Sequence, residues 1–185
     1  AALALNTTAP YSTAVGYQAG YSNSTGGYLT AVGYKAGYAY TSTSESYGSV
    51  FYGYSAGQAT TTGHDNTFVG ANGNSNTTGS YNVAVGAAAL QSNTTASYNT
   101  ALGMQANQAN TTGAYQTIIG YQAGFSLTTG PQHTIVGAQA GYSLTTSGYC
   151  AMFGQYAGAN ATGGYNTFLG FNCASQVTTG AKNTV

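Results

Sequence analysis

The stretch from Tyr115 to Gly130 reads YQTIIGYQAGFSLTTG, and it returns with small changes along the chain. Ser12 to Gly20 reads STAVGYQAG, and Asn99 to Ala106 reads NTALGMQA. We call the glycine that ends each AVG-like tripeptide the marker glycine; the markers are Gly16, Gly33, Gly53, Gly70, Gly86, Gly103, Gly120, Gly137, Gly154 and Gly170. Their spacings are 17, 20, 17, 16, 17, 17, 17, 17 and 16 residues. A fixed period of this length is the signature of a repeat architecture, so residues 1–185 are predicted to form a single repeat domain of about eleven units.

A unit of 17 residues rich in Thr, Tyr, Val, Ala and Gly has no room for a useful helix together with its turns. Val, Tyr and Thr favour strands, and glycine supplies the positive φ angles of tight corners. We expect corners at the markers and at the glycines of the TTG triplets, seven residues earlier: Gly26, Gly63, Gly79, Gly113, Gly130, Gly163 and Gly180. Each unit is then one coil of an all-β parallel β-roll or β-solenoid, adding about 4.8 Å to a rod.

Two neighbouring rows of apolar residues precede the markers. The residue immediately before each marker, which we expect to be buried, is Val15, Val32, Tyr52, Val69, Val85, Leu102, Ile119, Val136, Phe153 or Leu169. The row one residue earlier is Ala14, Ala31, Phe51, Phe68, Ala84, Ala101, Ile118, Ile135, Met152 and Phe168. Adjacent strand residues point to opposite faces, so the two rows cannot share one core. We expect the earlier row to be either core or, as an exposed apolar stripe, the contact between identical chains packed side by side.

The composition excludes several classes of function. The 185 residues include 28 glycines and 18 tyrosines but only four charged side chains, Lys35, Glu45, Asp65 and Lys182. Two lysines and no arginine cannot neutralise the phosphates of a nucleic acid. A chain that is 42% hydrophobic is expected to be ordered, and no apolar run approaches the roughly 20 residues that span a bilayer. The start lacks the features of a signal peptide, and both ends interrupt a unit without capping repeats, so we expect a processed chain or a segment of a longer fibre.

The sequence gives little support for a catalytic site or a metal-binding site. His64 and Asp65 are adjacent at an expected turn, where we expect their side chains to diverge, and no nucleophile–base–acid set is indicated. His133 occupies the position that Asn66, Asn82, Asn99 and Asn166 take in other units, so it is expected to join a polar ladder. The spacing of His and Cys does not suit zinc. We therefore predict no enzyme activity, no metal and no cofactor.

The two cysteines occupy different positions in the repeat. Cys150 takes the same asparagine position, whereas Cys173 replaces a repeated alanine. We expect them on different walls of the coil and therefore unable to form a disulfide. Cys173 is expected to be a small buried apolar residue.

Six Asn-X-Thr sequons begin ten residues before a marker, at Asn6, Asn23, Asn76, Asn93, Asn110 and Asn160. One interpretation is a row of turn-forming asparagines whose amides stack from unit to unit. The other is N-glycosylation along one exposed edge of the rod.

Two further rows could face a ligand. Threonine recurs eight residues before the marker, with Glu45 as the exception, at Thr8, Thr25, Thr62, Thr78, Thr95, Thr112, Thr129, Thr146, Thr162 and Thr179. This row resembles the hydroxyl arrays of β-solenoid ice-binding proteins, and it also fits a simple β-branched ladder. A tyrosine row, Tyr11, Tyr28, Tyr81, Tyr98, Tyr115, Tyr149 and Tyr165, could stack on sugars, although stacked aromatic rings also stabilise parallel coils by themselves.

The repeated segments Ser12–Gly20 and Asn99–Ala106 resemble the head repeats of YadA-like trimeric autotransporter adhesins and similar repeats of bacteriophage tail fibres. The resemblance covers nearly the whole chain, although the units are longer than those of that family. It implies a left-handed parallel β-roll, a homotrimer, and a place outside the cell or on a virion. We therefore expect a structural and adhesive fibre segment that attaches to a surface, with identical chains and a cell-surface glycan or receptor as partners. The alternatives are a self-assembling surface filament and a glycan- or ice-binding β-solenoid.

Overall fold

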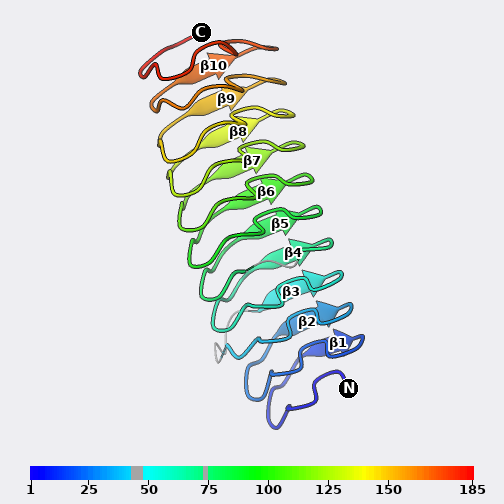
Figure 1. Ribbon diagram of the computed structural model, residues 1–185. Coiled ribbons are helices and arrows are strands. Elements are labelled where there is room, and N and C mark those ends of the chain that lie inside the picture. Colours follow the sequence, from blue (N-terminus) through cyan, green and yellow to red (C-terminus); the bar gives the residue numbers. More distant parts are fainter. Residues whose placement is uncertain (43–47, 73–74) are drawn as a thin grey trace.

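A computed structural model describes residues 1–42, 48–72 and 75–185. Those residues contain no helix, and ten short strands form one sheet in chain order, every neighbouring pair parallel. The coils stack into a rod with the termini at opposite ends (Figure 1). The predicted all-β solenoid is therefore confirmed. The strands are β1 Thr13–Val15, β2 Leu29–Val32, β3 Ser49–Tyr52, β4 Thr67–Val69, β5 Val83–Val85, β6 Thr100–Leu102, β7 Thr117–Ile119, β8 Thr134–Val136, β9 Ala151–Phe153 and β10 Thr167–Leu169.

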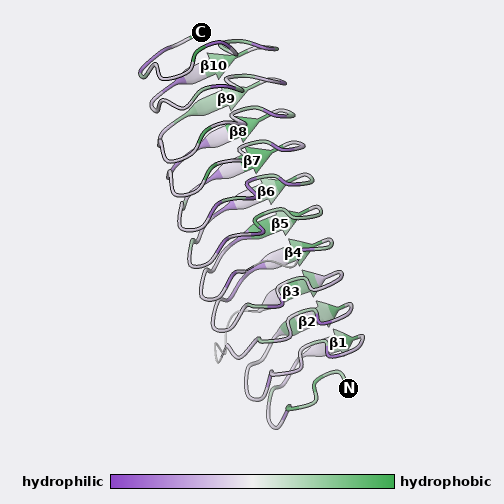
Figure 2. Ribbon diagram, in the orientation of Figure 1, coloured by the Kyte–Doolittle hydropathy of each residue, from purple (hydrophilic) through white to green (hydrophobic). Residues whose placement is uncertain are grey.

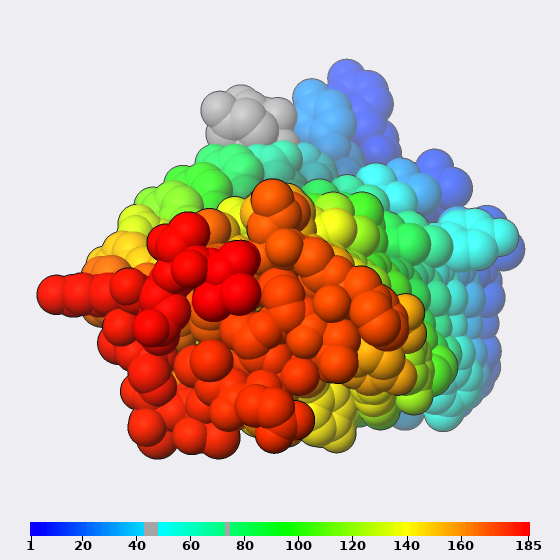
Figure 3. All heavy atoms as spheres, turned by 90° about the horizontal axis from the view of Figure 1, so that it is seen from above, coloured from blue at the N-terminus to red at the C-terminus, as the bar shows by residue number. Residues whose placement is uncertain are grey.

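The repeat sets the strand register. Thr100 pairs with Thr117, which pairs with Thr134, so equivalent residues of successive units lie directly above one another. The 20-residue spacing after Gly33 leaves this register intact, because Ala31 pairs with Phe51 and Phe51 pairs with Phe68. Seen from the C-terminal end, successive coils lie behind one another (Figure 3). Each row of the repeat is therefore a straight ladder along the rod.

The row two residues before the markers forms the core. Phe51, Phe68, Ile118, Ile135 and Phe168 are fully buried, and so are all other members except Ala14, which packs partly buried against them. Figure 2 shows the hydrophobic residues concentrated on the strands. The facing wall is lined by small residues three positions after the marker: Ala19, Ala36, Ala56, Ala89, Ala106, Ala123, Ala140 and Ala157. Small side chains opposite large ones keep the coil flat enough for close packing.

The marker glycines turn the chain at the end of each strand. Gly103 has a φ of +129°, and a Cβ built on it would lie 2.6 Å from the carbonyl oxygen of Gly120 in the next coil. Glycine is therefore required here for both its backbone angle and its lack of a side chain. The predicted corner at the markers is confirmed.

The TTG glycines play a different part from the one expected. None of them is among the residues with positive φ in the described chain, so they are not left-handed corners. A Cβ on Gly79 would lie 2.2 Å from the carbonyl oxygen of Ala96 in the next coil, which explains why the side chain is absent. The left-handed positions are instead taken by residues such as Tyr98 and Gln105, with φ of 63° and 58°.

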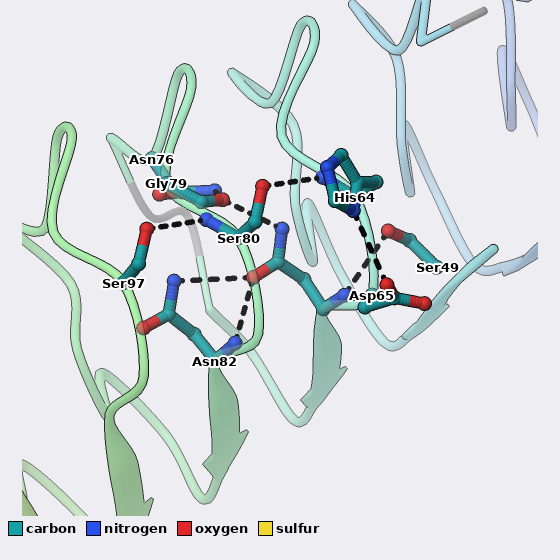
Figure 4. Close-up of polar contacts among 9 residues, drawn as sticks. Ser49, His64, Asp65, Asn76, Gly79, Ser80, Asn82 and Ser97 are labelled. Atoms are coloured by element: carbon teal, nitrogen blue, oxygen red, sulfur yellow. Dashed lines mark hydrogen bonds and ion pairs between the residues drawn. The ribbon is translucent and has the colours of Figure 1, made fainter. Parts of the chain in front are cut away.

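A buried polar ladder runs beside the apolar core (Figure 4). The backbone N–H of Asn82 donates to Oδ1 of Asn66 at 3.0 Å, and its Nδ2 donates to the same oxygen at 3.1 Å. The pattern repeats one coil later, where the backbone N–H of Asn99 donates to Oδ1 of Asn82 at 3.1 Å. Both asparagines also donate from Nδ2 to carbonyl oxygens, those of Ala96 and Gly113. These bonds satisfy polar groups that would otherwise destabilise the interior.

Candidate functional site

The outward side of the sheet is apolar. The residues immediately before the markers, from Val15 to Leu169, are exposed or half-buried; Val15 is 58% exposed, Tyr52 57% and Leu169 72%. The outward residue at the strand start is usually threonine, as in Thr100, Thr117 and Thr134. We call the two outward rows together the strand face.

The expectation that the row before the markers is buried was therefore wrong. Strand residues alternate, and the row from Ala14 to Phe168 has taken the inward side. That earlier row is core and cannot be the contact between chains. Tyr52 was the available signal in the sequence, because a buried tyrosine hydroxyl needs a hydrogen-bond partner inside the protein, whereas an outward hydroxyl reaches water.

The strand face carries no charged residue along the described part of the chain. Lys35 lies two residues after a marker, with its Nζ 5.5 and 5.6 Å from the ring centres of Tyr34 and Tyr38. Asp65 lies in the turn before β4, Lys182 lies in the turn before the bridge residue Thr184, and Glu45 falls outside the described residues. An apolar ladder of ten strands extends over roughly 50 Å without an electrostatic barrier to close packing.

The Asn-X-Thr row forms a second buried ladder. Asn23, Asn76, Asn93 and Asn110 are fully buried. Nδ2 of Asn93 donates to Oδ1 of Asn76 at 2.9 Å, and Nδ2 of Asn110 donates to Oδ1 of Asn93 at 3.2 Å. The stacked-amide interpretation is confirmed for these three residues.

Glycosylation was the alternative interpretation of this row, and burial of the four sites argues against it. A glycan would have to be attached to a side-chain nitrogen that lies inside the coil and already donates to protein oxygens at Asn76, Asn93 and Asn110. Asn6 is half-buried and its Nδ2 donates to the carbonyl oxygen of Ala9, and only Asn160 is exposed. The row is therefore structural and does not form a continuous glycosylated edge.

His64 and Asp65 lie against each other in the described part of the chain. Nδ1 of His64 lies 3.2 Å from Oδ2 of Asp65, so the expectation that these side chains diverge was wrong. Asp65 has a φ of 53°, and this left-handed turn departs from the extended geometry that separates successive side chains. The described residues hold no group of three His, Cys, Asp or Glu side chains that could bind a metal ion.

His133 continues the asparagine ladder, as its position predicts. Its Nε2 lies 2.7 Å from the carbonyl oxygen of Ser147, and its Nδ1 lies 3.3 Å from the backbone N–H of Cys150. A neutral ring protonated on Nε2 satisfies both contacts. Burial lowers the pKa of His133 below its usual value of 6.5, and the hydrogen bond to Ser147 opposes that shift.

Both cysteines are free thiols, which confirms that they do not pair. Burial raises the pKa of Cys150, and to a degree that of Cys173. Thiols that stay protonated are poor nucleophiles. Cys173 is only half-buried, contrary to its expected full burial, although it packs against the core.

The aromatic residues form stacked columns along the surface. The ring of Tyr98 lies between those of Tyr81 and Tyr115, with centroids 4.9 and 5.0 Å away and planes within 6°. Both faces of Tyr98 are thereby covered, although its edge is exposed. A sugar cannot stack on a ring whose two faces are occupied, so the interior of this column serves the coil itself.

The threonine row eight residues before the markers is exposed in all ten units. The neighbouring threonines are not equally available, because Thr94 and Thr111 donate their hydroxyls to carbonyl oxygens of the next coil at 3.1 and 3.2 Å. Within the exposed row, Thr162 also donates its hydroxyl, to the carbonyl oxygen of Thr178 at 3.1 Å. This edge therefore presents at most a single rank of available hydroxyls, and not the flat array of hydroxyls that an ice-binding surface needs.

Comparison with known proteins gives no relative. No family model matches the chain, and no curated protein and no solved structure matches it. No helix among the described residues is long and apolar enough to cross a membrane.

Proposed function

We propose that this chain is a segment of a structural, adhesive fibre, in which identical rods pack side by side through the strand face. The observation that carries the proposal is the unbroken outward apolar ladder from Val15 to Leu169, free of charged residues. Isolated exposed apolar residues are ordinary, but a contiguous stripe of this length on a soluble protein indicates a contact surface.

The geometry of the rod suits identical partners. Equivalent residues recur at every coil in register, so a contact that one coil makes with a neighbouring rod can be repeated by each of the others. Complete burial of an exposed apolar side chain contributes about 1.5–3 kcal/mol. Half of the row is already half-buried in the single rod, so each contact contributes less than this, but ten such contacts add to a firm association. A three-fold arrangement and a place outside the cell or on a virion follow from the resemblance to YadA-like and tail-fibre repeats.

The test is the native mass of the protein and of two matched variants. We expect light scattering to give three times 18.6 kDa for the unmodified chain. Ile119→Lys combined with Val136→Lys places charges on the strand face and should yield monomers, because each lysine would be desolvated on packing. Thr112→Lys combined with Thr129→Lys adds the same charges to exposed positions of the threonine row and should leave the mass unchanged.

A monomeric unmodified chain would overturn side-by-side packing. Loss of association in the control pair as well as in the face pair would show that added charge, and not the strand face, is responsible. A larger, polydisperse mass that is lost only in the face pair would favour the self-assembling filament over the trimer.

A further inference from the structure

We infer that the C-terminal coils carry a binding site for an uncharged pyranose sugar, in a hollow of about 340 Å³ between Tyr142 and Tyr156. This inference does not depend on the packing of rods. The hollow lies in the turns after the strands and not on the strand face.

The hollow lies where an aromatic column stops. The rings of Phe125 and Tyr142 stack with centroids 5.1 Å apart and planes at 3°. In the next coil the equivalent residue is Ala159, whose carbonyl oxygen accepts a hydrogen bond from the backbone N–H of Ser143. Among the described residues, therefore, no ring covers the second face of Tyr142, unlike the interior of the Tyr81–Tyr115 column.

A ladder of amides stops at the same level. Nε2 of Gln122 donates to Oε1 of Gln105 at 2.9 Å, and Nε2 of Gln139 donates to Oε1 of Gln122 at 2.8 Å. The next residue in this row is Tyr156, which has no amide to donate to Oε1 of Gln139. The oxygen that ends the ladder belongs to a residue that lines the hollow and can accept a hydrogen bond from a ligand.

The remaining walls are polar and uncharged. Asn160, Asn172 and Gln176 contribute amides, and Nδ2 of Asn160 is held by a hydrogen bond of 2.8 Å to the carbonyl oxygen of Ser175. The ring of Tyr156 packs edge-on against that of Phe171, with ring centroids 6.4 Å apart. None of the side chains that line the hollow is charged.

This combination selects one ligand chemistry. An aromatic face accepts the C–H face of a pyranose ring, and amides match its hydroxyls as both donors and acceptors. An anionic ligand would find no cation, and a purely apolar one would leave the amides unpaired. The volume is within the range of small-molecule sites.

The experiment is a binding titration by ligand-observed NMR with glucose, galactose, mannose and N-acetylglucosamine as probes. We expect at least one of them to bind. Ala159→Tyr extends the aromatic column into the hollow and should weaken that binding by roughly two- to tenfold, as expected for loss of a stacking face. Gln58→Tyr adds a ring at the same position of an earlier coil and should leave binding unchanged.

The outcomes are distinct. Failure of all four sugars to bind the unmodified chain overturns the site, as does binding that survives Ala159→Tyr in a folded protein. If Ala159→Tyr does not fold, Gln139→Ala replaces it, with the same expected loss. The native mass of the chain is measured separately, so a failed sugar site and a failed fibre assembly are distinguishable.

Discussion

Several tyrosines adopt a backbone conformation that is unusual for a bulky residue. Tyr81, Tyr98 and Tyr115 have φ of 60°, 63° and 59°. The left-handed conformation costs roughly 1–2 kcal/mol for a residue with a Cβ, and a stacked aromatic pair contributes about 0.5–1.5 kcal/mol. The stacked column therefore offsets much of the backbone strain, which explains why tyrosine recurs at a position where glycine would be expected.

His133 makes stability depend on pH. Above about pH 6.5 the ring is neutral in both the folded and the unfolded chain, and its titration has no effect. Below that value the unfolded chain takes up a proton that the buried ring resists, so stability falls until the pH reaches the lowered folded pKa. Protonation would also place a hydrogen on Nδ1, facing the backbone N–H of Cys150.

We therefore predict that the melting temperature falls more between about pH 7.5 and about pH 5 in the unmodified protein than in His133→Asn. Asparagine occupies the equivalent position in other coils, so the variant retains a polar ladder. His64 is present in both proteins and does not distort the comparison. Thermal denaturation followed by circular dichroism provides the measurement, and parallel pH profiles would refute the prediction.

For single residues, the sequence predicted which rows are apolar and which are polar better than it predicted which rows face the interior. The place of His133 in the asparagine ladder followed from its position in the repeat. The inward side of the strand could not be predicted, because both rows before the markers are apolar. The same limit applies to Asn76, Asn93 and Asn110: an Asn-X-Thr sequon has the same sequence whether its amide faces water or the interior. Only the three-dimensional path of the turns decides between them.

Among the elements, the strand-ending turn is the most constrained. Gly120 has a φ of +132°, and an added Cβ would lie 2.6 Å from the carbonyl oxygen of Gly137. Gly124, four residues later, has a φ of +56°, and an added Cβ would meet its nearest atom at 3.4 Å. Leu90 and Asn107 occupy the equivalent position in other coils, so that turn accepts a side chain.

We predict that Gly120→Ala destabilises the rod by several times the cost of Gly124→Ala, which should be about 1–2 kcal/mol. Both changes add one methyl group within the same coil, so the difference isolates the contact between coils. Urea denaturation provides both free energies of unfolding. Equal values would mean that the coils can separate slightly to accommodate the methyl group.

The period, the strand and the marker corner could be predicted from the sequence, because glycine and β-branched residues occupy them in nearly every unit. The other corners could not. Tyrosine and glutamine at left-handed positions contradict ordinary preference, and there the stacking and amide ladders between coils help to stabilise them. The TTG glycines were misassigned for a related reason, since close approach of the next coil requires glycine just as a positive φ does.

Over the whole molecule, interactions are local along the axis. In the described chain each strand contacts only its neighbours in sequence. Stability should therefore behave as a sum of coil and interface contributions, as in other repeat proteins. A defect in one coil is expected to weaken that coil and its two neighbours.

We predict that Ile118→Ala, which removes a fully buried side chain from β7, increases amide exchange in β6, β7 and β8 and leaves β1 and β2 unchanged. Thr112→Ala alters an exposed residue of the threonine row, away from the strand face, and should have little effect on exchange. Hydrogen–deuterium exchange with mass spectrometry resolves the coils. A uniform increase along the rod would show that it opens as one cooperative unit.

The hydrogen bonds between coils run along the rod, from the backbone of one coil to that of the next. Tension applied at the two termini would therefore strain these interfaces in series, and the coil with the weakest interface would open first while the others held. Each opened coil releases about 17 residues, or roughly 55 Å of extended chain. A rod that is stiff under small loads can thus lengthen in discrete steps under large ones, and dissipate the work of a sudden pull without breaking.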